Sequence, residues 1–295
     1  MSTFKQYVIQ YIDRNIHVAL AVVSLVLLTY HYSATAVDWA YVIFAGMGTL
    51  VTYTYIKNVP PQVSIVFGVK QVLKQSPLWI HILALIVLGL IIALNQSQRL
   101  VLVVITMLCL GYILPRPMVK HHEKLSIKQR NIPSTLRDFG AIKIVIVALV
   151  WGCVSVLMPF LSYRTLNPEI WWLFIAQTLW IAVLTIPFEI RDAVKDQLRQ
   201  PTWPQKLGLT GVKVLGSSLL VISMAIHLWL FSKVEDSAEH QIVFLSLPYV
   251  MVMIFTQLGL IRAKANQSYW YSAFWMEAIP IAWLILYCLN VFMIE

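Results

Sequence analysis

Residues 187–208 read PFEIRDAVKDQLRQPTWPQKLG and follow a long apolar run. They contain Glu189, Asp192 and Asp196, three of the 13 acidic residues in the chain. Spacings of three and four residues return side chains to nearly the same face of a helix, so the three carboxylates would point the same way. Carboxylates that close repel one another and favour a divalent cation or basic partners. Because Mg²⁺ prefers oxygen ligands, we predict that these three residues form a Mg²⁺ site.

The same stretch also fits a simpler interpretation, a solvated turn of helix just outside a membrane. Arg191, Lys195 and Arg199 alternate with the acids and would neutralise them. Short acidic motifs are loose, so the spacing of the acids does not choose between the two interpretations.

The composition of the chain indicates a membrane protein. Of its 295 residues, 59% are hydrophobic and 12% are charged, whereas soluble domains carry about 25% charged residues. The formal net charge of +9 would suggest a nucleic-acid partner in a soluble protein, but here it indicates cytoplasmic loops rich in Lys and Arg. We therefore expect membrane lipid, and no nucleic acid, as a partner.

Nine apolar segments are long enough to cross a bilayer as helices, and longer than the roughly ten residues of a barrel strand. They run over residues 15–32, 36–57, 78–95, 99–115, 139–162, 168–189, 211–231, 242–260 and 270–293. The sequence therefore predicts an all-α, polytopic membrane protein, a bundle of nine transmembrane helices that forms one domain over residues 1–295.

The Lys and Arg residues gather on one side of this predicted bundle. Nine spans place the N-terminus on the same side as loops 58–77, 116–138, 190–210 and 261–269. That side, with the adjoining helix ends, holds 19 of the 22 Lys and Arg residues. Because positively charged loops stay in the cytoplasm, we expect these loops and the N-terminus inside, the C-terminus outside, and the protein in the inner (cytoplasmic) membrane.

Glu277 is a separate candidate, because it lies about two turns inside the last span and three residues before Pro280. An acid inside a membrane is a functional candidate by default. A structural acid fits equally well, since a proline kink leaves backbone groups that need partners. The lone helix histidines His81 and His227 are interpreted as packed residues.

The stretch 187–208 resembles the second aspartate-rich region of the UbiA-type intramembrane prenyltransferase superfamily. That region has the pattern D-x-x-D-x-x-x-D, then a short polar run, then T-x-P-x-x-L-G. The acidic positions are occupied by Glu189, Asp192 and Asp196. The positions of the ending are occupied by Thr202, Pro204, Leu207 and Gly208. The resemblance implies the nine-helix bundle of that family, with a central cavity open toward the cytoplasmic loops.

Enzymes of this superfamily hold Mg²⁺ around a prenyl diphosphate. The resemblance therefore implies transfer of a prenyl group from an allylic isoprenoid diphosphate to a lipophilic acceptor of the aromatic or quinone type. In this chain it assigns Mg²⁺ to Glu189, Asp192 and Asp196, and it assigns no catalytic residue beyond them. The residues expected to hold the diphosphate are Lys57, Asn58, Tyr112, Arg116, Lys120 and Arg191.

One half of the family pattern is missing from this chain. The first acidic region, typically N-D-x-x-D-x-x-x-D, would lie around residues 52–65, yet no Asp or Glu occurs between Asp38 and Glu123. Lys57 and Asn58 stand where carboxylates are expected. Losing half of the Mg²⁺ ligands would weaken the stabilisation of a departing diphosphate.

Two classes of function therefore stay open. The first is a prenyltransferase, and the second is a non-catalytic descendant that binds an isoprenoid, another anionic lipid or a membrane partner. Lys57 would bind a phosphate directly, or would pair with Glu189 or Asp192 and close the site without metal. A secondary transporter is a weaker third candidate, because the sequence has no visible inverted repeat.

Overall fold

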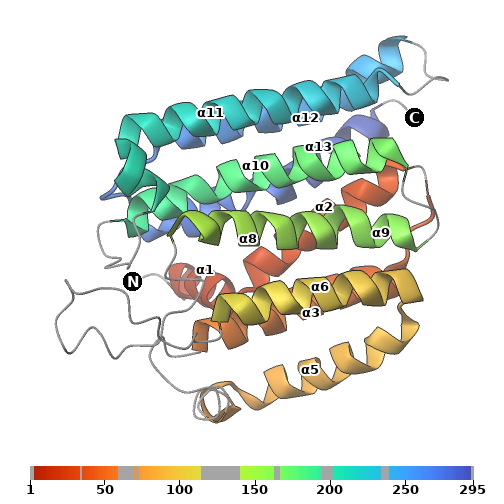
Figure 1. Cartoon of the computed structure of the whole chain (residues 1–295), viewed down its shortest axis with the longest axis vertical. Coiled ribbons are helices and arrows are strands. Elements are labelled where there is room, and N and C mark those ends of the chain that lie inside the picture. Colours follow the sequence, from red (N-terminus) through yellow and green to blue (C-terminus); the bar gives the residue numbers. More distant parts are fainter. Residues whose placement is uncertain are drawn as a thin grey trace, which may run out of the picture.

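The computed structural model of the chain describes residues 3–33, 35–58, 70, 73–113, 140–162, 167–193, 202–233 and 239–293. Every regular element in these ranges is a helix. Figure 1 shows the long helices running side by side as a bundle, with the two termini at opposite ends. The predicted all-α fold of a polytopic membrane protein is confirmed.

Within the described ranges, each predicted span coincides with a helix or with a helix interrupted by a tighter or wider turn. These elements are α2 (Ile16–Tyr32), α3 (Trp39–Asn58), α5 with η1 (Leu78–Leu90, Ile91–Ala93), α6 (Gln96–Ile113), α8 with η3 and α9 (Gly140–Gly152, Cys153–Leu157, Met158–Leu161), α10 (Pro168–Asp192), α11 (Trp203–Phe231), α12 (Glu239–Arg262), and η4 with α13 (Tyr271–Met276, Ile279–Phe292).

Several helices have the length and apolar composition needed to cross a membrane. Five pass this test alone: Trp39–Asn58, Ile142–Leu161, Pro168–Asp192, Trp203–Phe231 and Tyr271–Phe292. The shorter apolar helices are Leu78–Ala93, Gln96–Tyr112 and Ser246–Arg262. The prediction of an integral multi-pass membrane protein is confirmed. The number of nine crossings, the membrane and the orientation of the termini stay predictions.

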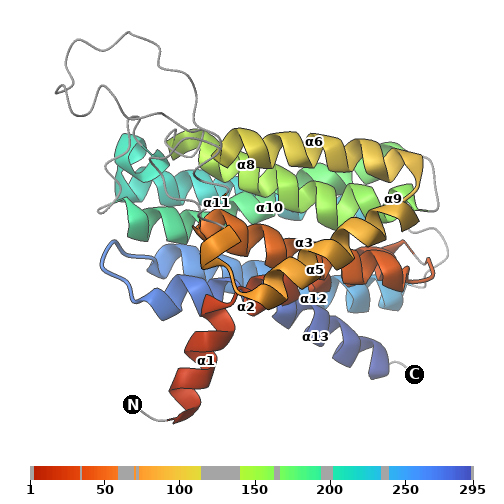
Figure 2. The same cartoon turned by 90° about the horizontal axis from the view of Figure 1, so that it is seen from below.

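The N-terminal region differs from the sequence prediction, because a separate helix α1 (Thr3–Asp13) precedes the first span. It meets α2 at 65° and projects away from the bundle in Figure 2. Asn15 forms the bend with a φ of 60°, a left-handed conformation that asparagine adopts more readily than most residues. Its amide donates to Thr54 Oγ1 at 3.0 Å, which ties the bend to α3.

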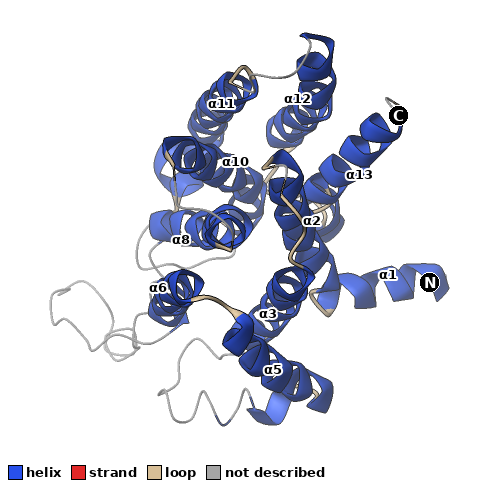
Figure 3. Cartoon of the chain, turned by 90° about the vertical axis from the view of Figure 1, so that its right-hand side faces the viewer, coloured by secondary structure: helices blue, strands red, loops and turns tan. Residues whose placement is uncertain are grey.

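Seen along its axis, the bundle is a ring of helices (Figure 3). Neighbours in contact around the ring are α2 with α3, α3 with α5, α6 with α8, α8 with α10, α10 with α11, α11 with α12, α12 with α13, and α13 with α2. Large apolar side chains on its outside are exposed, among them Leu85, Val221 and Ile285. A surface of this kind is expected against lipid.

Aromatic side chains fill the ring where α10, α11, α12 and α13 face one another. Trp180 and Trp283 are buried and meet edge to face, with ring centroids 5.2 Å apart. Tyr249 lies 5.1 Å from Trp283 and stacks on His227 at 4.3 Å. His227 is therefore a packed residue, as predicted, and aromatic rings from four helices pack against one another in this part of the ring. His81 is also engaged, since its Nδ1 lies 3.0 Å from the Tyr55 hydroxyl.

Candidate functional site

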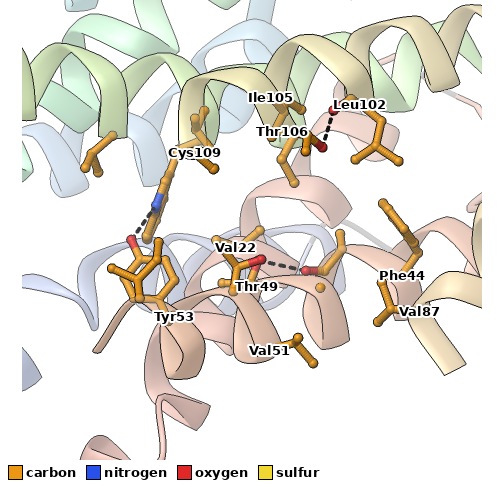
Figure 4. Close-up of a pocket in the computed structure, with 18 of the residues that line it drawn as sticks. Val22, Phe44, Thr49, Val51, Tyr53, Val87, Leu102, Ile105, Thr106 and Cys109 are labelled. Atoms are coloured by element: carbon orange, nitrogen blue, oxygen red, sulfur yellow. Dashed lines mark hydrogen bonds between the residues drawn. The ribbon is translucent and has the colours of Figure 1, made fainter. Parts of the chain in front are cut away.

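An apolar cavity of about 330 Å³ lies between α3, α6 and α8 (Figure 4). Its wall is completed by Val22 of α2 and Val87 of α5. The hydroxyls of Thr49 and Thr106 are used within their own helices, where they donate to the carbonyl oxygens of residues 45 and 102 at 2.7 and 2.8 Å. The cavity therefore offers a hydrocarbon-like surface with few free polar groups.

One face of α8 and of the η3 turn that continues it forms a side of this cavity. The residues that line it, at intervals of one helical turn, are Ile146, Val147, Val150, Trp151 and Val154, as expected for one face of a helix. Continuing the same face by one turn toward the start of α8 leads to residue 143.

The cavity wall includes the hydroxyl of Tyr53 and the indole of Trp151. Trp151 Nε1 donates to Tyr53 Oη at 2.9 Å, the bond drawn beside Tyr53 in Figure 4. Tyr112, which was predicted to hold a diphosphate, is buried in this wall. Tyr53, Tyr112 and Trp151 together give one region of an otherwise aliphatic cavity a polar edge.

Beyond this face, Lys143 forms an ion pair with Glu189, one of the predicted Mg²⁺ ligands. Lys143 Nζ lies 2.6 Å from Glu189 Oε1, and the two side chains are only 18% and 3% exposed. Breaking a buried pair by removing one partner costs about 3–5 kcal/mol, because a charge is left buried without compensation. Lys143 was not singled out in the sequence, although it is the one charged residue in the run from residue 140 to 161. A charge inside an apolar span is the signal that identifies it.

Asp192, the second predicted Mg²⁺ ligand, is bound by the neighbouring Arg191. Arg191 donates through Nε and Nη2 to the two carboxylate oxygens of Asp192, at 2.7 and 3.1 Å. This two-point contact is the strongest arrangement for such a pair. The remaining Nη1 donates to Ser272 Oγ at 2.7 Å, which ties the end of α10 to η4.

Lys57 contacts the end of α1. Its Nζ lies 3.7 Å from Asp13 Oδ1 and donates to the Asp13 carbonyl oxygen at 3.1 Å. The proposed pairing of Lys57 with Glu189 or Asp192 was therefore wrong, because both acids have other cationic partners. Asn58, also predicted at the diphosphate, donates to Ser76 Oγ at 3.0 Å.

Tyr269 contacts both the Lys57–Asp13 pair and the Arg191–Asp192 pair, so the two pairs lie at the same end of the bundle. Its hydroxyl donates to Asp13 Oδ1 at 3.1 Å, and the guanidinium carbon of Arg191 lies 5.9 Å from its ring centroid. Burial and then the Asp13 carboxylate raise the pKa of Tyr269 to about 12, so its hydroxyl stays a donor at neutral pH. We call Asp13, Lys57, Lys143, Glu189, Arg191, Asp192 and Glu277 the charged end.

Glu277 lies between η4 and α13 and keeps part of its surface accessible. It makes no hydrogen bond or ion pair within the described part of the chain. The structural alternative, in which Glu277 supplies a partner for backbone groups at the Pro280 kink, is therefore not what is observed.

The described acids do not fit a Mg²⁺ ion in this arrangement. Glu189 and Asp192 are each neutralised by a cation of the protein. In the described ranges, no group of three or more His, Cys, Asp or Glu side chains is close enough to hold a metal ion. Three of the predicted site residues, Asp196, Arg116 and Lys120, lie outside the described residues.

The end of the motif, residues 202–208, shapes the start of α11. Thr202 and Gln205 form a capping box, in which each side chain accepts from the backbone N–H of the other residue. Gln205 Nε2 also donates to the Ala193 carbonyl oxygen at 2.8 Å. Gly208 has a φ of 70°, which glycine adopts without steric cost. This half of the motif therefore sets how the chain enters α11.

One of the comparisons with known proteins bears on the fold. No protein-family model matches the chain, and no curated protein matches its sequence. Among solved structures, the apo structure of a UbiA homolog from Aeropyrum pernix K1 is similar, with a TM-score of 0.57 and 15% sequence identity over 94% of this chain and 98% of that chain. The fold is of the UbiA type. The UbiA-type fold, expected from residues 187–208, is thus confirmed over nearly the whole chain.

Proposed function

We propose that this UbiA-like membrane protein holds an isoprenoid-type hydrocarbon chain in its apolar cavity and does not carry out Mg²⁺-dependent prenyl transfer. The observation that carries the proposal is the buried ion pair between Lys143 and Glu189. It puts a cation of the protein on a carboxylate that a metal-dependent enzyme of this fold would need free.

The cavity supports a hydrocarbon ligand. Its volume of about 330 Å³ lies within the range of roughly 300–1,000 Å³ that is typical of ligand sites. Val22, Val87 and Ile105 present only apolar atoms to it. A linear isoprenoid chain matches this surface, because it has no polar groups to leave unpaired inside the membrane.

The ion pair argues against a metal at the same place. A Mg²⁺ ion at Glu189 would have to displace the Lys143 ammonium or sit beside it, and like charges at short distance repel. The bidentate hold of Arg191 on Asp192 opposes metal binding in the same way. A ligand with a phosphate end would instead meet the partly exposed Lys57.

The test is the thermal stability of the purified protein in detergent with geranylgeranyl diphosphate, with and without Mg²⁺. A ligand that binds the folded state stabilises it, by about 2.7 kcal/mol at a hundredfold excess over Kd. We expect the same stabilisation in the presence and absence of Mg²⁺. Stabilisation that requires Mg²⁺, or a prenylated product in an acceptor screen, would contradict the proposal.

Prenyl transfer to a lipophilic acceptor is the second candidate, favoured by the acidic end of α10 in a UbiA-type fold. Glu189 and Asp192 lie one turn apart there, and Asp196 continues the pattern in the sequence. For this candidate, Asp192→Asn is expected to abolish Mg²⁺-dependent turnover. Turnover that survives this substitution would exclude the assignment of Asp192 as a metal ligand.

A further inference from the structure

Two neighbouring residues of α3, Thr52 and Tyr53, bring hydroxyl groups to the wall of the apolar cavity. They precede Lys57 by about one turn of the helix. Farther from this end of α3, the cavity is lined by apolar side chains such as those of Phe44 and Ala45. The polar edge of the cavity therefore lies toward the charged end of the bundle.

The Tyr53 hydroxyl joins two walls of the cavity and has a proton to donate. Its oxygen accepts from Trp151 Nε1 of α8 at 2.9 Å, the bond drawn in Figure 4. Because this bond uses the hydroxyl as an acceptor, its own proton is left over. In the described part of the chain, no acceptor receives that proton. A hydroxyl that accepts one hydrogen bond is polarised by it and becomes a stronger donor in a second.

The Thr52 hydroxyl is also available, unlike the hydroxyls of two other threonines that line the cavity. Thr49 and Thr106 donate to carbonyl oxygens one turn back in their own helices, at 2.7 and 2.8 Å. Thr52 makes no such bond, and it makes no other hydrogen bond with the residues that the structure describes. A hydroxyl without a partner is unfavourable in an apolar site inside a membrane, so Thr52 favours a ligand that can accept from it.

Two available donors beside each other select the polar group of a ligand. A carbonyl oxygen has two lone pairs and no proton, so it can accept from both hydroxyls at once. A plain hydrocarbon chain leaves both protons without an acceptor. A diphosphate carries charges that are far more costly to desolvate between apolar side chains, and it fits better at the half-exposed Lys57.

We infer that the cavity binds a lipophilic carbonyl compound, a ketone on an isoprenoid-type chain, whose carbonyl oxygen accepts hydrogen bonds from Tyr53 and Thr52. The inference rests on the proposed function and specifies the polar group of the ligand. Trp151 is a positioning residue in this site, because its indole N–H holds the Tyr53 hydroxyl at the cavity wall and leaves the hydroxyl proton for the ligand.

The test compares farnesylacetone with the hydrocarbon that has a methylene group in place of the carbonyl. Their Kd values are measured by thermal stabilisation of the purified full-length protein in detergent. The variants are Thr52→Val and Tyr53→Phe, which each remove one hydroxyl with little change of shape. Because one hydrogen bond between neutral groups has a modest net strength, each variant should bind the ketone about threefold to tenfold more weakly relative to the hydrocarbon.

Thr49→Val is the matched control. Thr49 lines the same cavity from the same helix, but its hydroxyl is already bonded within α3. This substitution should change the two Kd values by the same factor, so that their ratio stays that of the unsubstituted protein. Tyr53→Phe also leaves the Trp151 N–H without its acceptor, so Thr52→Val decides the test if Tyr53→Phe fails to fold.

Each outcome bears on a definite claim. Binding of the hydrocarbon shows that a variant is folded. An unchanged ratio of the two Kd values in Thr52→Val or in a folded Tyr53→Phe, or an equal change of the ratio in Thr49→Val, would overturn this inference alone. Failure of both ligands to bind the unsubstituted protein would overturn the proposed cavity function and this inference with it.

Discussion

Helices α10–α13 and helices α3–α8 enclose two different interiors. Between α10, α11, α12 and α13, the buried ring of Trp283 packs against those of Trp180 and Tyr249 and forms an aromatic core. Between α3, α6 and α8, shorter side chains such as Val22 and Thr49 line a cavity of about 330 Å³. We call these the filled half and the hollow half.

In the filled half, side-chain volume is used for packing between helices, whereas in the hollow half it leaves room. Inside a membrane, helices gain little from leaving lipid, so close packing between them carries much of the stability. The filled half has that packing in full. The hollow half gives up part of it, which is expected where a ligand supplies the missing contacts.

Trp283→Ala is the substitution expected to destabilise the filled half most. Trp283 is 2% exposed, and truncating a packed tryptophan costs about 3–5 kcal/mol. A smaller change in the hollow half, Val150→Ala, removes about two methyl groups beside existing space and should cost about 1–2 kcal/mol. Thermal unfolding in detergent measures both. A loss from Val150→Ala as large as that from Trp283→Ala would mean that the hollow half is packed more tightly, atom for atom, than the filled half.

Lys143→Gln tests the ion pair that borders the hollow half. The substitution removes the Lys143 cation from the buried Glu189 carboxylate and should cost up to about 3–5 kcal/mol. We expect added Mg²⁺ to restore part of the stability of this variant and to leave the unsubstituted protein unchanged. Lys206→Gln, at an exposed position near the start of α11, is the control. This substitution should not lower the stability, and Mg²⁺ should not change the stability of the variant.

The double variant Lys143→Gln, Glu189→Gln separates charge from packing. With both charges gone, the penalty for an unpaired buried ion disappears, so most of the lost stability should return. A double variant as unstable as Lys143→Gln would show that the side chains matter through their packing and not through their charges.

The space around one glycine in each half allows the packing of the two halves to be compared directly. A Cβ at Gly216 in the filled half would lie 2.7 Å from Leu260 Cδ2 and 2.9 Å from Ile186 Cδ1, whereas a Cβ at Gly48 in the hollow half would meet Val87 at 4.0 Å. Gly216→Ala should therefore destabilise the protein by about 1–3 kcal/mol. Gly48→Ala should be neutral or stabilise it by up to about 1 kcal/mol, because alanine favours the helix. Opposite signs in thermal unfolding support the comparison, and equal signs contradict it.

Gly48→Leu tests whether the cavity binds the ligand. A leucine at this cavity position should occupy space that the ligand needs and reduce stabilisation by geranylgeranyl diphosphate, while Gly48→Ala should retain most of it. Ligand-induced shifts in the unfolding temperature measure the effect. Unchanged binding in Gly48→Leu would place the ligand elsewhere.

Lys57→Gln is expected to have the smallest effect on stability. The side chains of Lys57 and Asp13 are 54% and 51% exposed, and exposed ion pairs contribute about 0–1 kcal/mol. Added salt should reduce even this difference, because it screens exposed charges. A loss as large as that of Lys143→Gln would mean that Lys57 has a buried role that its present contacts do not explain.

Which segments are helices, and that they form a membrane protein, could be predicted from the order of the residues alone. Apolar runs of membrane length specify helices because a bilayer offers backbone groups no other partners. Local chemistry also set specific ends, since Thr202 and Gln205 cap α11 through contacts within four residues of chain. The motif in residues 187–208 indicated the UbiA-type fold because its spacing can be read within one short stretch of the chain.

Which charged side chains form pairs, and where the cavity lies, depends on how the helices pack in three dimensions. The sequence predicted that Glu189 is a metal ligand. Its partner Lys143, however, lies on another helix, and the spacing of residues in a sequence does not report distances between helices. The contact between Lys57 and Asp13 could not be predicted either, because it depends on the bend at Asn15 that directs α1 away from the bundle. The cavity arises because side chains from several helices face one another across the ring, and its volume depends on all of them at once.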